Sequence, residues 1–190
     1  HIMYMYFVIT PPEATVERGW IRGQQRGRYK SVEDFLGHSV EAYQGIPKLI
    51  FKWLAHTSPR YEFSFFDNSV AEGQFPLTSV IGNQKGMQVF DPMVFVNIER
   101  YQKINIYAQS LAQVYPSSKR MAIANNMTFF NQCLKRFPKV CFSVGQDSDP
   151  YLIVRQKTYT LPDPTLFDQQ LEDPTLKILF EQILINRILR

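Results

Sequence analysis

Residues 127–144 read MTFFNQCLKRFPKVCFSV, and their hydrophobic period changes at Pro138. Before the proline, apolar residues recur at intervals of three or four, which is the spacing of one helix face. These residues are Ile123, Met127, Phe130, Leu134 and Phe137. After the proline, Val140, Phe142 and Val144 alternate with less apolar residues, which is typical of a half-buried strand. The stretch predicts a helix followed directly by a strand, and therefore a fold that contains both.

A second long helix is predicted upstream, between Asp91-Pro92 and Pro116. Apolar residues from Val94 to Val114 keep the helical spacing. An Asp-Pro pair favours a helix start, because the carboxylate accepts free N–H groups and proline has no N–H to leave unpaired. The next helix is expected to begin at Ser118, after a short connection, so the two predict an antiparallel helical hairpin.

The remaining elements are predicted from shorter patterns. Residues 4–9 predict an apolar strand, with the end of a membrane helix as the alternative. Residues 31–58 predict a helix broken by a kink at Gly45 to Pro47, and residues 61–65 predict a strand. Short strands are expected near 77–81 and 86–90, and a β-hairpin over 140–161. The last helix starts at Asp173-Pro174, and at least two of the four Asp-Pro pairs should begin helices.

The predicted fold class is α+β. Residues 4–190 form a single domain with a kinked N-terminal helix, a helical hairpin, a small and largely antiparallel sheet, and an apolar C-terminal helix. Strands and helices come in runs, which argues against a doubly wound sheet with a nucleotide crevice. Residues 1–3 are interpreted as a cloning remnant.

The charge of the chain is unevenly distributed. The formal net charge is +4, with a surplus of positive charge before residue 146 and a surplus of negative charge after it. Such a balance permits an anionic partner without requiring one. The densest basic stretch runs from Arg18 to Lys30 and contains five basic residues and no acidic one.

This basic stretch is the candidate nucleic-acid site. Its glycines disfavour a helix, so a loop is expected. Guanidinium groups bind phosphates, glycines allow close backbone approach, and aromatic faces stack on unpaired bases. The candidate residues are Arg18, Trp20, Arg22, Arg26, Arg28, Tyr29 and Lys30. Two alternatives stay open: a solvated loop whose arginines pair with nearby or C-terminal acidic residues, and a surface that meets anionic lipid headgroups.

The apolar face of the C-terminal helix is wider than one buried side needs, so the helix is either buried on both sides or covered by a second copy or partner. The second alternative makes it a candidate protein interface. The interface residues would be Leu176, Phe180, Ile183, Leu184 and Ile188, facing another protein or a second copy. An assembly subunit is therefore the alternative function. It could be the soluble part of a membrane-anchored complex if the gene continues upstream of Tyr4 with an apolar segment.

An enzyme is the less favoured class. Cys133, Cys141 and three scattered histidines do not form a metal site, and Asp147 with Asp149 is more typical of a turn. His38 has no nucleophile motif near it, so any active site would have to be gathered from distant residues. No metal or small-molecule cofactor is expected. The sequence leaves open a Cys133–Cys141 bridge and the compartment, with a cytoplasmic location as the working expectation.

Overall fold

Seven strands of the described chain form one sheet, in which spatial order follows chain order. They are β1 (Ile2–Ile9), β2 (Arg60–Asp67), β3 (Leu77–Asn83), β4 (Gly86–Val89), β5 (Lys139–Phe142), β6 (Leu152–Arg155) and β7 (Thr158–Thr160). The pairs β1–β2 and β4–β5 are parallel, and the other four are antiparallel. The computed structural model describes residues 1–56, 58–156 and 158–188, and the side chains of these residues except 182 and 185–188.

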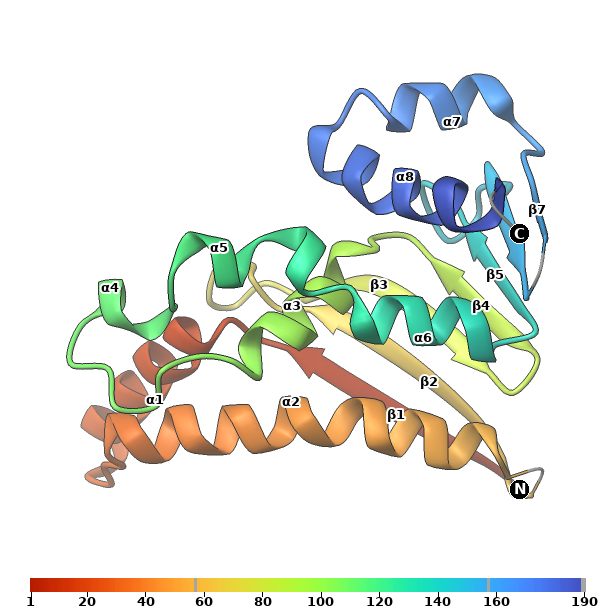
Figure 1. Ribbon diagram of the computed structural model, residues 1–190. Coiled ribbons are helices and arrows are strands. Elements are labelled where there is room, and N and C mark those ends of the chain that lie inside the picture. Colours follow the sequence, from red (N-terminus) through yellow and green to blue (C-terminus); the bar gives the residue numbers. More distant parts are fainter. Residues whose placement is uncertain (57, 157, 189–190) are drawn as a thin grey trace.

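The two parallel pairs require long crossover connections, and these carry most of the helices. The first holds α1 (Pro12–Arg26) and α2 (Val32–Leu54). The second holds α3 (Met93–Tyr101), α4 (Leu111–Val114), α5 (Ser118–Met121), the 3₁₀ turn η1 (Ile123–Asn125) and α6 (Thr128–Arg136). The chain closes with α7 (Pro164–Gln170) and α8 (Pro174–Ile188). These crossovers cover one face of the sheet (Figure 1).

The core lies between that face and the helices, and aromatic rings dominate it. Phe65 on β2 is fully buried against Phe95 of α3 and Phe129 of α6, and Phe63 on the same strand is buried against Phe137, just after α6. At the other end, the Phe180 ring of α8 lies 5.3 Å from that of Phe142 on β5, centroid to centroid. These rings belong to one cluster that extends from β1 to α8. Each buried ring removes a large apolar area from water and so stabilises the fold.

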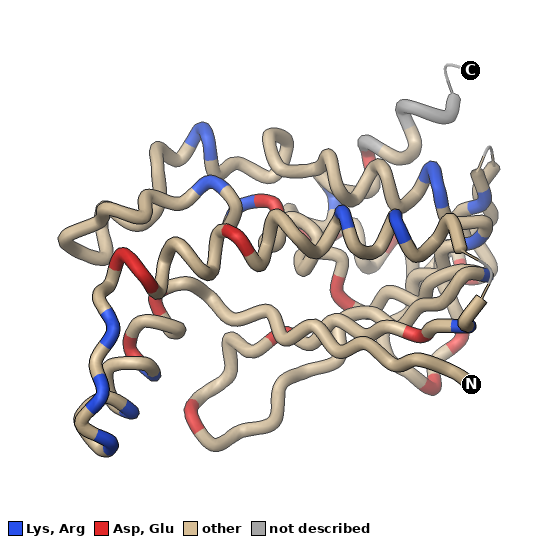
Figure 2. The backbone as a smooth tube through the Cα atoms, turned by 90° about the horizontal axis from the view of Figure 1, so that it is seen from below, with Lys and Arg blue, Asp and Glu red and all other residues tan. Residues whose placement is uncertain are grey.

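The opposite face of the sheet is not covered by any helix in the part of the chain that the structure describes (Figure 2). Alternate side chains of β1 point to this open face, and Tyr4, Tyr6 and Val8 are exposed there. The ring of Tyr6 contacts that of Phe66 on β2 at a centroid distance of 5.8 Å. β1 also forms one edge of the sheet, so its outer backbone groups have no neighbouring strand among the described residues.

The α+β class and most strand predictions are confirmed. The sheet is larger than expected, since the predicted second arm of the β-hairpin is divided into β6 and β7. Ile2 and Met3, interpreted as cloning residues, extend β1 by pairing with Arg60 and Tyr61 of β2.

The predicted capping of helices by Asp-Pro pairs is also confirmed. The carboxylate of Asp163 accepts a hydrogen bond from Leu166 N at 2.9 Å at the start of α7. That of Asp173 accepts one from Thr175 N at 2.7 Å at the start of α8.

The predicted break at residues 45–47 is wrong, because α2 runs without interruption through Pro47. Proline inside a helix has no N–H for the carbonyl four residues before it, which here is Tyr43 O. Gln102, just after α3, donates its Nε2 to that carbonyl at 3.1 Å. A tertiary hydrogen bond therefore replaces the one that Pro47 removes.

The predicted helical hairpin is also wrong. α3 ends at Tyr101, and the chain folds back so that Asn105 N donates to Val114 O at 2.8 Å. Ile104 and Ala108 are then buried with Leu36 in a small second cluster.

The helix expected from Ser118 is interrupted: α5 ends at Met121, and the longer helix α6 begins only at Thr128. The buried side chain of Asn126 donates to Arg120 O and Ala122 O, which stabilises an irregular turn before α6.

Candidate anion-binding site

The basic segment is helical over most of its length, which corrects the predicted loop. α1 has Pro12 at its first position and ends at Gly27, whose φ of 65° is the left-handed conformation that glycine adopts most easily. Gly19 and Gly23 lie where α1 meets the chain that returns after Gly27. A β-carbon at Gly19 would overlap the Phe35 ring, and one at Gly23 would lie 2.7 Å from Cδ1 of Tyr29. These two glycines therefore serve packing within the chain, not the approach of a ligand.

The C-terminal half of α1 and the segment leading into α2 enclose a cavity of about 630 Å³, which we call the basic hollow. Its lining consists of four basic side chains, two glycines and one aromatic ring: Arg22, Arg26, Arg28, Lys30, Gly19, Gly23 and Phe35. No acidic residue lines it. Figure 2 shows the basic residues of α1 and the following segment gathered at one end of the molecule.

The four cations of the basic hollow are not neutralised by a carboxylate of the described chain. The ion pairs among the described residues are Lys103–Glu99 and Lys177–Glu181, both far along the chain. All four basic residues are exposed. Arg26 lies in the last turn of α1, where a cation also stabilises the negative end of the helix dipole. Four like charges around one cavity repel each other, so a bound anion would relieve that repulsion.

Three other predicted site residues, which do not line the basic hollow, make contacts within the chain. Arg18 donates Nη2 to Val70 O at 2.7 Å and to Asn68 O at 3.3 Å, so it anchors α1 to the connection after β2. Trp20 and Tyr29 pack on each other, with ring centroids 5.2 Å apart, and both rings remain more than half exposed.

The structure therefore brings together Arg22, Arg26, Arg28 and Lys30, and adds Phe35. The four-residue spacing of Arg22 and Arg26 is the sequence signal for their proximity. Phe35 had no such signal, because its position fits the apolar stripe of α2.

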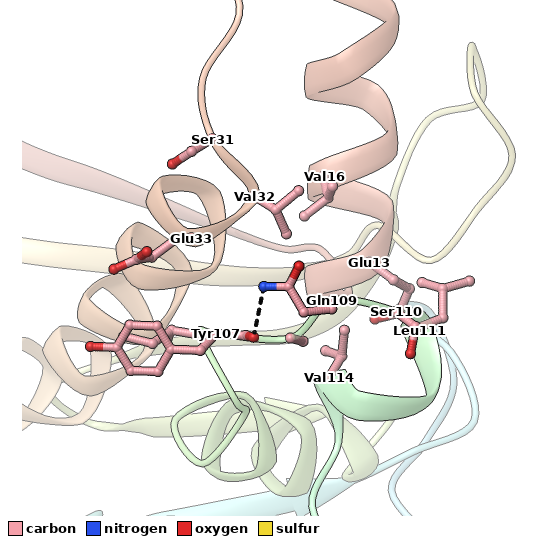
Figure 3. Close-up of a pocket in the computed structure, with 12 residues that line it drawn as sticks. Glu13, Val16, Ser31, Val32, Glu33, Tyr107, Gln109, Ser110, Leu111 and Val114 are labelled. Carbon is pink, nitrogen blue, oxygen red and sulfur yellow. Dashed lines mark hydrogen bonds between the residues drawn. The ribbon is translucent and has the colours of Figure 1, made fainter.

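A cavity of about 440 Å³ near the start of α1 has a different character (Figure 3). Glu13 and Glu33 line it together with valines of α1, α2 and α4, and no basic residue does. Gln109 closes one side by donating Nε2 to Tyr107 O at 3.5 Å. Two carboxylates without a cation disfavour an anion, so this cavity does not compete with the basic hollow for phosphate.

The residues considered for catalysis do not converge. Asp147 and Asp149 are exposed in the turn after β5, and His38 lies on the exposed side of α2 with Nδ1 against Asp34 O. The described residues contain no group of three or more His, Cys, Asp or Glu side chains placed to hold a metal ion. Cys133 and Cys141 are both free thiols, which excludes the bridge left open by the sequence.

The candidate interface residues of the C-terminal helix pack against the chain itself. Phe180 and Ile183 are buried in the core, and Leu176 and Leu184 lie partly buried against it. Phe180 packs on Phe142 of β5 and Phe167 of α7, so it offers no exposed surface to a partner, whereas Ile178 on the same helix is 39% exposed. The side chain of Ile188 lies outside the described part. No described helix is long and apolar enough to cross a membrane.

No protein-family model matches this sequence, and neither the curated proteins nor the solved structures contain a match.

Proposed function

We propose that the protein is a non-enzymatic binding module that holds a phosphate-rich polymer, single-stranded nucleic acid above all, in the basic hollow. The observation that carries this proposal is the convergence of Arg22, Arg26, Arg28 and Lys30 on one cavity that no carboxylate lines. Arginine presents paired N–H donors that match phosphate oxygens, and phosphate contacts supply most of the affinity for nucleic acids. An unpaired strand suits the site better than a duplex, because exposed aromatic rings lie nearby.

The charge of the basic hollow sets the expected salt dependence. If the four cations neutralise about four phosphates of a single strand, log K falls by roughly 2.8 per tenfold increase in salt. Raising the salt from about 50 to about 200 mM should then weaken binding about 50-fold. Each arginine removed should lower the slope by about 0.7.

The test is fluorescence anisotropy with labelled RNA and DNA strands of about ten nucleotides, titrated at several salt concentrations. The test variant carries Arg22→Ala, Arg26→Ala and Arg28→Ala, three exposed positions. A matched control carries the same loss of charge at three exposed cations elsewhere: Lys119→Ala, Arg120→Ala and Lys135→Ala. Binding that the test variant loses and the control keeps supports the proposal. No binding at low salt, or equal loss in both variants, overturns it.

Competition separates a polymer ligand from a small one. Unlabelled strand and a nucleoside triphosphate are added in turn to the labelled complex at equal phosphate concentration. Displacement by the strand alone supports a polymer that spans several phosphate contacts. Equal displacement by the triphosphate would replace the polymer with a nucleotide as the ligand of the same hollow.

The assembly-subunit alternative receives less support from the fold. Phe180 and Ile183 of the C-terminal helix are buried in the core, so they offer no surface to a partner. The exposed apolar side chains lie on β1 instead, at Tyr4, Tyr6 and Val8. An anchored, membrane-linked form remains a prediction that depends on sequence upstream of Tyr4.

A further inference from the structure

The outer edge of β1 is long, apolar and unprotected. β1 has eight residues, none of them charged and none a proline, and it pairs with β2 in one unbroken register. Proteins usually protect a sheet edge with charged residues, proline, a bulge or a very short strand, because free N–H and C=O groups pair readily with another strand. The opposite edge of the sheet follows this rule, since β7 has only three residues. The β1 edge is therefore available to a further strand.

Alternate residues of β1 direct their backbone groups to this edge. Ile9 O accepts a hydrogen bond from Asn68 N, just after β2, at 2.8 Å. Because backbone direction alternates along a strand, the odd-numbered residues of β1 bond to β2 and the even-numbered ones face outward. The outward-facing residues are Ile2, Tyr4, Tyr6 and Val8. At the next even position, Thr10, both backbone groups bond to the Tyr43 hydroxyl, at 2.9 Å for N and 2.6 Å for O, so the free edge ends there.

We propose that two copies of the chain pair antiparallel through β1, with Met5 opposite Met5 of the second copy on a two-fold axis. This register places Tyr4 opposite Tyr6 and Ile2 opposite Val8, so residues with outward backbone groups meet each other. Each such pair exchanges two hydrogen bonds. A shift by one residue would set outward groups against residues that already bond to β2, and a shift by two in either direction would leave some of them unpaired. The edge is thus complementary to itself, as a symmetric dimer requires.

The side chains fit this pairing on both faces of the joined sheet. On the open face, Tyr4 of each copy would lie beside Tyr6 of the other, and such aromatic cross-strand pairs are favourable. Phe66 already holds the Tyr6 ring, at a centroid distance of 5.8 Å. On the helix side, a groove of about 740 Å³ lies between β1 and α2, and Phe7 lines it. Met3 of the second copy, opposite Phe7, would enter this groove.

The exposed surface of β1 is large enough for a reversible dimer. Five of its side chains are between 40% and 67% exposed: Ile2, Met3, Tyr4, Tyr6 and Val8. Each presents on the order of 100 Å², so pairing of two copies would remove roughly 1,000 Å² from water. This area is close to the value of about 1,200 Å² at which specific, stable interfaces begin. With no charge on β1, nothing on the strand itself repels the second copy.

Sedimentation velocity tests the dimer at protein concentrations from about 1 to about 500 μM, where a monomer–dimer equilibrium is expected. The test variant is Tyr6→Lys, which places two charges near the centre of the interface at a position that is 67% exposed. The matched control is Leu77→Lys, a 63% exposed position on β3, away from the edge. Tyr6→Lys should raise the dissociation constant of the dimer about 10-fold or more, and Leu77→Lys should leave it unchanged.

Disulfide cross-linking tests the register. In Met5→Cys the two introduced thiols would face each other in a non-hydrogen-bonded pair with Cα atoms about 4.5 Å apart, which is within disulfide range. Met3→Cys is the matched control, because its two thiols would lie four residues apart along the paired strands, a distance on the order of 13 Å. Both variants also carry Cys141→Ser, which removes the half-buried native thiol. Mild oxidation should link Met5→Cys into a covalent dimer and leave Met3→Cys largely unlinked.

The outcomes decide between edge pairing and other states. A chain that stays monomeric at about 500 μM overturns the proposal and leaves the edge to a strand of another protein. A dimer that Tyr6→Lys leaves intact, or that both lysine variants weaken equally, also overturns it. Cross-linking of Met3→Cys as efficient as that of Met5→Cys would rule out the register. No residue of β1 lines the basic hollow, so the dimer and the proposed binding of nucleic acid stand or fall separately.

Discussion

Replacement of Glu99 by alanine is expected to destabilise the protein far more than loss of an ordinary surface charge. Glu99 lies on α3 and is only 7% exposed. Its Oε2 accepts a hydrogen bond from Phe129 N at 3.1 Å, at the start of α6, where Met127 provides no side-chain cap. Its Oε1 pairs with Lys103 Nζ at 3.2 Å. The carboxylate thus connects two helices that the sequence alone does not place together.

The expected cost follows from the groups that lose a partner. In Glu99→Ala the buried Phe129 N–H is left without an acceptor, which costs about 1–3 kcal/mol. The Lys103 ammonium keeps hydrogen bonds to Asn125 O and Asn126 Oδ1, and its side chain is 28% exposed, so its share is about 1 kcal/mol. The free energy of unfolding should fall by about 3 kcal/mol in total. Glu99→Gln keeps an acceptor for Phe129 N and should cost about half as much.

The assay is equilibrium unfolding in urea, followed by far-UV circular dichroism and tryptophan fluorescence. The control is Glu181→Ala, which also removes a glutamate carboxylate from a Lys–Glu pair. In that pair both side chains are at least half exposed, and Lys177 Nζ lies 3.9 Å from Glu181 Oε1. That pair should contribute no more than about 0.5 kcal/mol. A Glu99→Ala cost as small as that of Glu181→Ala would refute the role of Glu99 as a tertiary cap. A Glu99→Gln cost equal to that of Glu99→Ala would show that the charge, and not the hydrogen bond to α6, matters.

Three further outcomes are expected. Burial raises the pKa of the Cys133 thiol well above its usual range. At neutral pH a thiol reagent should therefore modify the half-buried Cys141 in the folded protein, and Cys133 only after unfolding. Modification of Cys133 in the folded protein would contradict this expectation. Burial also raises the pKa of Tyr61 to about 12, so its contribution to stability is complete below about pH 10 and lost as the pH rises toward 12. Tyr61→Phe should lessen that loss in alkaline urea titrations without lowering stability at pH 7, because the hydroxyl has no hydrogen-bond partner; a loss of stability at neutral pH would contradict the reasoning. In Gly86→Ala, a β-carbon would overlap the backbone oxygen of Lys139. The free energy of unfolding, measured from the urea midpoint, should therefore fall by about 2 kcal/mol or more. An unchanged midpoint would show that β4 and β5 can separate slightly.

The candidate site was partly predictable. The basic composition of residues 18–30 and the four-residue spacing of Arg22 and Arg26 are visible in the sequence. The helix itself was not predicted, because glycine propensity argues against it and tertiary packing outweighs propensity. Phe35 and Tyr29 occupy the positions that the side chains of Gly19 and Gly23 would fill. The basic hollow exists because the chain turns back at Gly27 and brings the segment after it against α1. No local sequence pattern predicts that tertiary contact.

Local sequence patterns are sufficient to predict the elements whose stability is local. Alternation of apolar residues predicted β2 and β5, and Asp163 and Asp173 marked the starts of α7 and α8, because strand patterning and capping act within a few residues. Contacts between distant segments set where long apolar stripes end and which elements cover them. α2 continues through Pro47 because Gln102 satisfies the freed carbonyl, and the C-terminal helix finds its apolar partner in the sheet. Such contacts join residues distant in the chain, so their energies enter only when the whole fold has formed.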